Sequence, residues 1–171
     1  MVHGPSKRQS FRKKQYLCLM KKALITLLFL LAGCVAASAQ YFTGFSVNSY
    51  KITSAWPTSF RSVAGRVSVN IGNTGDTRAM SGIRATVYRG GRRFAHGTCE
   101  DVTFYRGTAS YVLKGQVSLA QGVSTWEAIR AALSFKASEY TVDFTIDITH
   151  PDGHTDHVAR TGVPITKYLH R

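Results

Sequence analysis

The sequence is poor in cysteine and in acidic residues, and it lacks a hydrophobic run long enough to cross a bilayer. Its 171 residues include three cysteines, 22 basic residues and nine acidic residues. The longest apolar run, residues 23–35, has 13 residues, whereas a membrane-spanning helix needs about 20. A permanent transmembrane helix is therefore not expected.

This apolar run has the flanks of a secretory signal peptide. Lys21 and Lys22 precede it and the small residues Ala-Ser-Ala at 37–39 follow it, which gives the basic, apolar and cleavage regions in order. We expect residues 1–39 to be an upstream extension and signal peptide, with the true start at Met20. Residues 40–171 would then be a single exported domain, periplasmic or secreted.

A second processing route stays open. The tetrapeptide Leu-Ala-Gly-Cys ending at Cys34 fits a bacterial lipobox. Lipidation of Cys34 would make the chain an outer-membrane-anchored lipoprotein. Cleavage after residue 39 is favoured, because Cys34 is followed at once by residues that are still apolar.

Removing the first 39 residues changes what the composition indicates. Residues 40–171 contain 15 basic and nine acidic residues, so the net charge falls from +13 to +6. The basic residues are scattered, which argues against nucleic acid and fits a soluble surface with weak attraction to anionic lipid or polysaccharide. Cys99 alone remains, so no intrachain disulfide is possible, and no partner histidine and asparagine mark it as a nucleophile.

The domain is predicted to be an all-β fold, an antiparallel sandwich of the immunoglobulin or fibronectin-III type with about seven strands. Short blocks alternate apolar and polar residues, as half-buried strands do. Gly90-Gly91 and Asp152-Gly153 supply turns between such blocks, and Pro164 suggests that the last strand lies at an edge. The apolar positions of the clearest blocks are Val67, Val69, Ile71; Ile83, Ala85, Val87; and Val142, Phe144, Ile146, Ile148.

One segment, at about residues 124–134, is predicted to be a short helix. Ser124 and Glu127 have the spacing of a capping box, in which each side chain bonds the backbone of the other. Trp126, Ile129 and Leu133 follow at helical spacing, with Ala132 beside them. We expect this face, and Trp126 in particular, to plug one open end of the sandwich.

With these blocks in place, the chain resembles the late embryogenesis abundant type 2 family, also called the water stress and hypersensitive response domain. The resemblance rests on the alternating strand at residues 67–73, the strand and turn at 83–93, and the later helix and strands in the same order. It implies an immunoglobulin-like or fibronectin-like sandwich without catalytic residues or cofactor. The predicted secretory signal is a departure from the plant members of the family. We therefore take from the resemblance only the fold.

Three histidines form the strongest candidate for a metal site in the sequence. His150, His154 and His157 lie within eight residues together with Asp152 and Asp156. If Asp152-Gly153 is a two-residue turn, His150 and His157 share one side of the hairpin and His154 points to the other. At most two ligands would then converge, fewer than a zinc site needs.

Candidate binding residues lie elsewhere. Arg89, Arg92 and Arg93, with Tyr88, gather on the Gly90-Gly91 hairpin, where paired N–H donors suit a phosphate, sulfate or uronate. Trp56, followed by Pro57, is expected in a loop, where it would either bind a ligand or cover the core.

No nucleophile elbow, Walker loop or dinucleotide fingerprint is present. We therefore expect a non-catalytic envelope domain, a monomer or weak oligomer, that binds an envelope protein, lipid or polysaccharide. The alternatives are a small metal-dependent hydrolase using the three histidines, or a subunit of a surface assembly that pairs through an edge strand.

Overall fold

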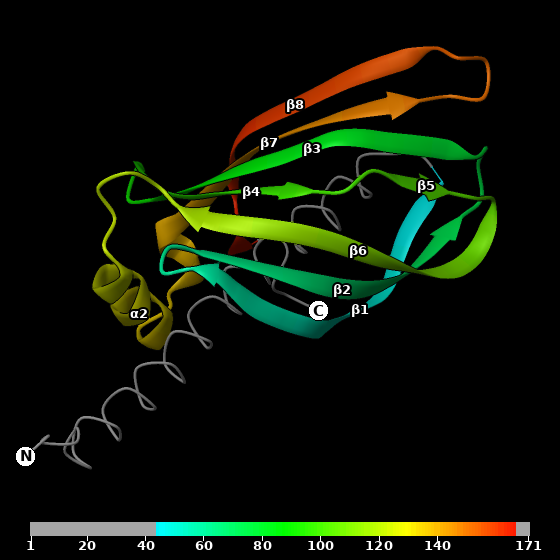
Figure 1. Cartoon of the computed structure of the whole chain (residues 1–171). Helices are drawn as coiled ribbons and strands as arrows, with labels where there is room; N and C mark the ends of the chain where they lie inside the picture. The colour runs from blue at the N-terminus through cyan, green and yellow to red at the C-terminus, as the bar shows by residue number, and fades with distance from the viewer. Residues whose placement is uncertain (1–43, 167–171) are drawn as a thin grey trace, which may run out of the picture.

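The computed structural model describes residues 44–166, so the predictions for the signal peptide, Met20 and Cys34 lie outside the described residues. These residues form an antiparallel β-sandwich with one short α-helix (Figure 1). The strands number eight where the sequence predicts about seven. They are β1 (Phe45–Ser59), β2 (Ser62–Asn73), β3 (Arg78–Arg89), β4 (Arg92–Cys99), β5 (Val102–Phe104), β6 (Gly107–Leu119), β7 (Tyr140–Thr149) and β8 (Thr155–Pro164). The helices are α2 (Thr125–Leu133) and the 3₁₀ turn η1 (Ala137–Glu139).

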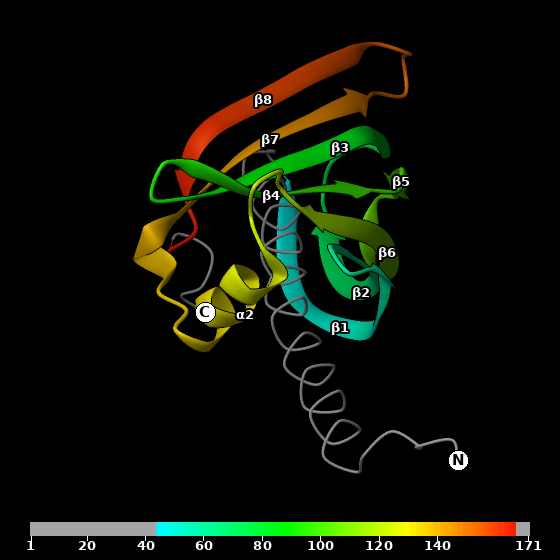
Figure 2. The same cartoon turned by 60° about the vertical axis from the view of Figure 1, so that its left-hand side comes forward.

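Hydrogen bonds connect the strands in the order β1-β2-β6-β4-β3-β7-β8, and β5 pairs with the start of β3. The sheet curls, so that β1, β2 and β6 form one layer and β3, β7 and β8 the other (Figures 1 and 2). The curl brings together buried residues from strands that do not pair, such as Val67 of β2 and Ile146 of β7. β8 ends the hydrogen-bonded order, as Pro164 predicts.

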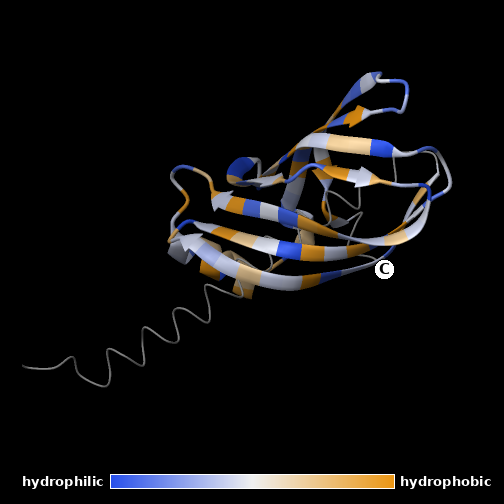
Figure 3. Cartoon of the chain, turned by 45° about the vertical axis from the view of Figure 1, so that its right-hand side comes forward, coloured by the Kyte–Doolittle hydropathy of each residue, from blue (hydrophilic) through white to orange (hydrophobic). Residues whose placement is uncertain are grey.

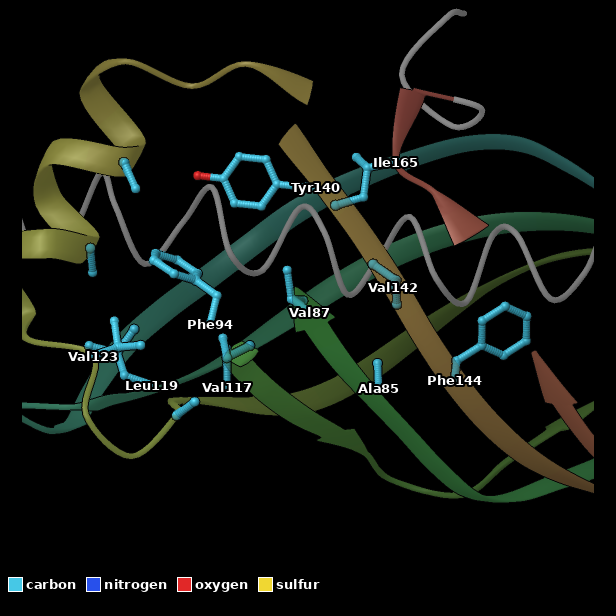
Figure 4. Close-up of a cluster of buried hydrophobic side chains, with 14 of the residues drawn as sticks. Ala85, Val87, Phe94, Val117, Leu119, Val123, Tyr140, Val142, Phe144 and Ile165 are labelled. Carbon is cyan, nitrogen blue, oxygen red and sulfur yellow. The ribbon is translucent and has the colours of Figure 1, made fainter. Parts of the chain in front are cut away.

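Hydrophilic and hydrophobic residues alternate along the strands (Figure 3), and because successive side chains of a strand point to opposite faces, this alternation decides which of them enter the core. In β7, buried and half-buried residues alternate without a break over all ten positions. The core has two clusters. One lies toward α2 and includes Val87, Phe94 and Tyr140 (Figure 4); the other lies farther along the strands and includes Phe104, Ile71 and Ile148.

The helix forms where predicted, but it turns a different face to the core. Ala128, Ile129 and Ala131 are buried, whereas Trp126 is 48% exposed and Leu133 is 65% exposed. The prediction that Trp126 plugs the sandwich is therefore wrong. Ala128 and Ala131 pack into the core cluster next to the helix, and this orientation turns Trp126 and Leu133 outward.

The cap of α2 is half of the predicted capping box. The Ser124 hydroxyl accepts a hydrogen bond of 3.1 Å from the Glu127 amide. The Glu127 carboxylate does not return to the cap, because it pairs with Arg92 of the β3–β4 hairpin at 3.4 Å. The cap thus fixes where the helix begins, and Glu127 connects the helix to a distant hairpin.

Candidate binding surface at the helix end

Three segments distant in the sequence meet at the end of the sandwich that α2 covers (Figures 1 and 2). We call this region the helix end and define it as the β1–β2 turn (60–61), the β3–β4 hairpin (89–93) and residues 120–139. The Thr125 hydroxyl donates to the Phe60 carbonyl at 3.0 Å. An Arg61 nitrogen donates to the Ala120 carbonyl at 2.7 Å. These bonds hold the β1–β2 turn beside the first turn of α2.

The predicted arginine hairpin belongs to this end, and its turn has the geometry that its glycines indicate. Gly90 and Gly91 have φ values of 56° and 79°, which only glycine adopts at little cost. The Gly90 amide donates to the Glu139 carbonyl at 3.0 Å. The hairpin tip is thereby fixed to the segment that follows the helix.

Arg89 and Arg92 each face a carboxylate. Arg89 contacts Glu139 through two nitrogens, at 3.0 and 3.1 Å, with its guanidinium over the Tyr140 ring. Arg92 contacts Glu127 at 3.4 Å and donates to the Gly122 carbonyl at 2.7 Å. Both arginines therefore serve to hold the helix end together, so they are less open to an external anion than their place on a hairpin suggests.

Arg93 and Tyr88 lie opposite each other in the β3–β4 register. Arg93 is exposed and Tyr88 is half-buried. Of the three predicted arginines, Arg93 is the one whose charge faces solvent without a carboxylate contact that the structure shows. It joins the exposed Arg61, Arg130 and Lys136 of the same end.

Positive charge is concentrated at the helix end. This region contains six basic and two acidic residues, a net charge of +4. The remainder of residues 44–166 contains seven of each sign and is neutral overall. The net charge of the described domain is therefore the charge of one end, and such a concentration attracts anionic surfaces more strongly than scattered charge does. The six basic residues are Arg61, Arg89, Arg92, Arg93, Arg130 and Lys136.

Large apolar side chains are exposed beside this charge. Trp126, Arg130 and Leu133 are spaced four and three residues apart, so they lie along one face of α2. All three are exposed, and Phe60, in the turn that contacts Thr125, is 84% exposed. The helix end thus combines three large apolar side chains with a net positive charge.

Trp56 lies near this end, although not in a loop as predicted. It belongs to β1, where its partner is Ala64 of β2. It is 40% exposed, and the Arg66 guanidinium lies 5.5 Å from its ring centre. Trp56 therefore lies on the exposed face of β1. Among residues 44–166, the structure shows no hydrogen bond or ring contact between Trp56 and the arginine hairpin.

The histidine hairpin lies at the opposite end, and its register differs by one residue from the predicted one. Thr149 pairs with Thr155, and Asp147 with His157. The connection between β7 and β8 has five residues, His150 to His154, and the His150 amide donates to the His154 carbonyl at 2.8 Å. The Asp152 side chain stabilises this loop by accepting from the His154 amide at 2.9 Å.

The shifted register changes which histidines meet. His150 and His154 each place Nε2 at 2.9 Å from a separate oxygen of Asp156, and their rings stack at 6.0 Å. His157 instead contacts Asp147. The prediction that His150 shares a side with His157 is therefore wrong. Among residues 44–166, no three His, Cys, Asp or Glu side chains are grouped so that they could hold a metal ion.

The hydrogen bonds from His150 and His154 lower the pKa of Asp156 below its ordinary value, and the contribution from His150 is the larger.

Burial, and to a smaller extent the neighbouring Glu100, raises the pKa of Cys99 to about 11. A thiol with so high a pKa is a poor nucleophile at neutral pH. Cys99 is half-buried, and its side chain packs against the second core cluster.

The sequence predicts the arginine hairpin but misses the apolar half of this surface. Phe60, Trp126 and Leu133 are indistinguishable by type from core residues, and only the packing of Ala128 and Ala131 decides which helix face is exposed. The sequence also cannot show that Glu127 and Glu139 neutralise Arg92 and Arg89, since these partners are 35 and 50 residues apart.

Comparison with known proteins leaves the chain unassigned. No family model and no curated protein sequence matches it. It is similar to a protein from Archaeoglobus fulgidus at 13% identity and a TM-score of 0.41, over 67% of this chain and 93% of that one. It is also similar to a beta-glucuronidase from glycoside hydrolase family 2 (14% identity, TM-score 0.31), over 67% of this chain but 11% of that one.

A FixG-related protein from Vibrio parahaemolyticus is similar at 9% identity and a TM-score of 0.29, over 71% of this chain and 97% of that one. Within the described residues, no helix is both long and apolar enough to span a membrane. At these identities and TM-scores, the comparisons assign neither a family nor a function to the chain.

Proposed function

We propose that the chain is a non-catalytic exported domain that binds a partner in the cell envelope through its helix end. The observation that supports this most directly is the charge distribution, +4 at the helix end and zero over the other described residues. A domain with one charged end and a neutral body is oriented by an anionic surface as it approaches. Export follows from the signal peptide predicted at residues 1–39, and the resemblance to the late embryogenesis abundant type 2 family is compatible with a binding domain.

The surface is also rigid enough to recognise a partner. Ion pairs and backbone bonds connect the β3–β4 hairpin to α2 and η1, and side-chain bonds connect the β1–β2 turn to α2. Side chains presented from connected elements lose less conformational freedom on binding than side chains on a free loop. Arg93 and Arg130 are exposed on this framework, so they are suitable for testing binding without breaking it.

The test is association of the exported chain with envelope fractions from cells that lack it. The double variant Arg93→Glu/Arg130→Glu should reduce the bound fraction roughly tenfold or more. Added salt should likewise reduce the bound fraction of the parent chain. The matched control is Arg84→Glu/Arg106→Glu, which makes the same charge change at exposed positions outside the helix end. If both pairs reduce binding equally, net charge alone is responsible and the assigned surface is wrong.

A further inference from the structure

We infer that the helix end docks onto the surface of a bilayer that contains anionic lipids. This inference rests on the proposed function and specifies the partner of the same surface. Its basis is the combination of exposed apolar side chains and positive charge at one end. Each component alone fits several partners, whereas together they favour a membrane interface.

The apolar component argues for hydrocarbon. A sugar is recognised by flat aromatic rings with paired polar groups, and an aliphatic side chain contributes little to that contact. Leu133 is aliphatic and 65% exposed, and it lies on the same face of α2 as Trp126. Phe60, 84% exposed, projects from the tip of the β1–β2 turn next to that helix. Tryptophan, phenylalanine and leucine are the residues with which interfacial helices enter the acyl boundary.

The charged component argues for anionic headgroups. Arg130 lies between Trp126 and Leu133 on the exposed face of α2, and Lys136, Arg93 and Arg61 are exposed nearby. Basic residues at this position would remain among phosphates while the apolar tips enter the bilayer, as long cationic side chains do at interfaces. The two carboxylates of the helix end, Glu127 and Glu139, are each paired with an arginine, so repulsion from the membrane is reduced.

The binding mode that follows is shallow. The buried face of α2 is already packed against the core cluster next to it through Ala128 and Ala131, so the helix stays folded on the domain. Only the tips of Trp126, Leu133 and Phe60 would enter the membrane. Affinity should therefore be modest, reversible and sensitive to both salt and lipid charge.

The experiment uses the processed, exported chain carrying Cys34→Ser, so that no acyl chain can be attached. Vesicles of phosphatidylcholine alone are compared with vesicles that contain phosphatidylglycerol, in sedimentation assays at low and high salt. Binding is expected only with phosphatidylglycerol, and it should fall roughly tenfold or more in Trp126→Ala/Leu133→Ser. The matched control is Tyr105→Ser, which removes an exposed aromatic ring, 63% exposed, outside the helix end.

Fluorescence gives a readout that a change in overall stability would not reproduce. In a Trp56→Phe background, Trp126 is the single tryptophan of the chain. Its emission should shift to shorter wavelength with anionic vesicles and remain unchanged with neutral ones. Thermal unfolding of every variant confirms that the fold is retained before binding is compared.

The outcomes separate the two proposals. If the Arg93→Glu/Arg130→Glu pair lowers association with envelope fractions while the parent chain binds no vesicles of either composition, the proposed function stands and the bilayer inference is overturned. Binding to a soluble polyuronate that survives Trp126→Ala/Leu133→Ser would also overturn it, in favour of a polysaccharide. If neither substitution affects vesicles or envelope fractions, the helix end is not the binding surface and both proposals fail.

Discussion

The Asn73 side chain connects three segments by hydrogen bonds at the end of the sandwich opposite the helix. It is 2% exposed, and its amide nitrogen donates to the carbonyls of Asp76 at 2.9 Å and Tyr105 at 3.3 Å. Its side-chain oxygen accepts from the Gly75 amide at 3.0 Å. A buried asparagine that uses both its donors and its acceptor replaces backbone pairing where β2 ends and the chain turns toward β3.

Replacing Asn73 should therefore destabilise the fold. We expect Asn73→Ala to lower the free energy of unfolding by about 2–3 kcal/mol, because buried backbone groups lose their partners. Urea denaturation measures this loss. Asn70→Ala is the matched control, since Asn70 is on the same strand but bonds Asn48 and Ser110 in an exposed ladder. Its expected cost is below about 1 kcal/mol, and equal costs for the two variants would contradict this account of Asn73.

Cys99 should react slowly in the folded protein. With a pKa of about 11, its thiolate fraction at pH 8 is on the order of one in a thousand, about a hundredfold below that of an unburied thiol. We expect iodoacetamide to modify the native processed chain roughly a hundredfold more slowly than the urea-unfolded chain at pH 8. The native rate should rise steeply as pH increases toward 11. A native rate close to the unfolded rate at pH 8 would show that the thiol is neither buried nor perturbed.

At the level of the elements, the strands are predictable from sequence, whereas the exposed face of the helix is not. β7 alternates in sequence and in burial because its side chains have a period of two and one face is covered. The helix has more than one candidate face, since Trp126, Ile129 and Leu133 compete with Ala128 and Ala131. The buried face is the one with which Ala128 and Ala131 enter the core cluster, and the orientation of α2 on the sandwich is a property of the whole fold.

The β7–β8 hairpin shows a second limit of the sequence. Asp152-Gly153 does lie in the turn, yet the connection has five residues, 150–154, instead of two, and bonds of the Asp152 side chain and the His150 amide stabilise it. A one-residue change in register moves each β8 side chain to the other face. For this reason the sequence places the histidines at the correct hairpin but pairs them incorrectly.

The same hairpin gives a pH-dependent prediction. The folded-state pKa of Asp156 is lower than its ordinary value of 3.8. Its hydrogen bonds to His150 and His154 therefore contribute stability above that ordinary value, and this contribution is lost as the pH falls through the lower folded value. In NMR titrations we expect the Asp156 carboxyl midpoint to lie below 3.8 in the parent and to move upward in His150→Ala/His154→Ala. An unchanged midpoint in the double variant would show that the histidines do not cause the shift.

At the scale of the whole molecule, the two core clusters are physically connected. β2, β3 and β7 each contribute buried residues to both clusters, as Val63 and Val67, Val87 and Met80, and Val142 and Ile146 do. The half-buried Ile52 of β1 packs against both clusters. Because continuous strands run through both regions, neither cluster can lose its structure without exposing the other. We therefore expect one cooperative unfolding transition.

Two probes on different clusters test this expectation. In a Trp56→Phe background, the fluorescence of Trp126 reports on α2, which packs on the cluster next to it through Ala128 and Ala131. The Cys99 thiol reports on the other cluster, against which it packs. Ile146→Ala removes a fully buried side chain of the second cluster and should lower the free energy of unfolding by about 3 kcal/mol. Since the strands are shared, the urea midpoint from tryptophan fluorescence should shift as far as the midpoint from Cys99 labelling.

Val87→Ala is the reciprocal variant, because Val87 is buried in the cluster next to the helix. It should move the Cys99 labelling midpoint as far as it moves the fluorescence midpoint. If Ile146→Ala shifts only Cys99 labelling and Val87→Ala shifts only fluorescence, the clusters unfold separately. The helix end would then be able to open while the far half stays folded, and a bilayer could select that open form. Coincident midpoints in both variants would instead show one cooperative unit and contradict separate opening of the helix end.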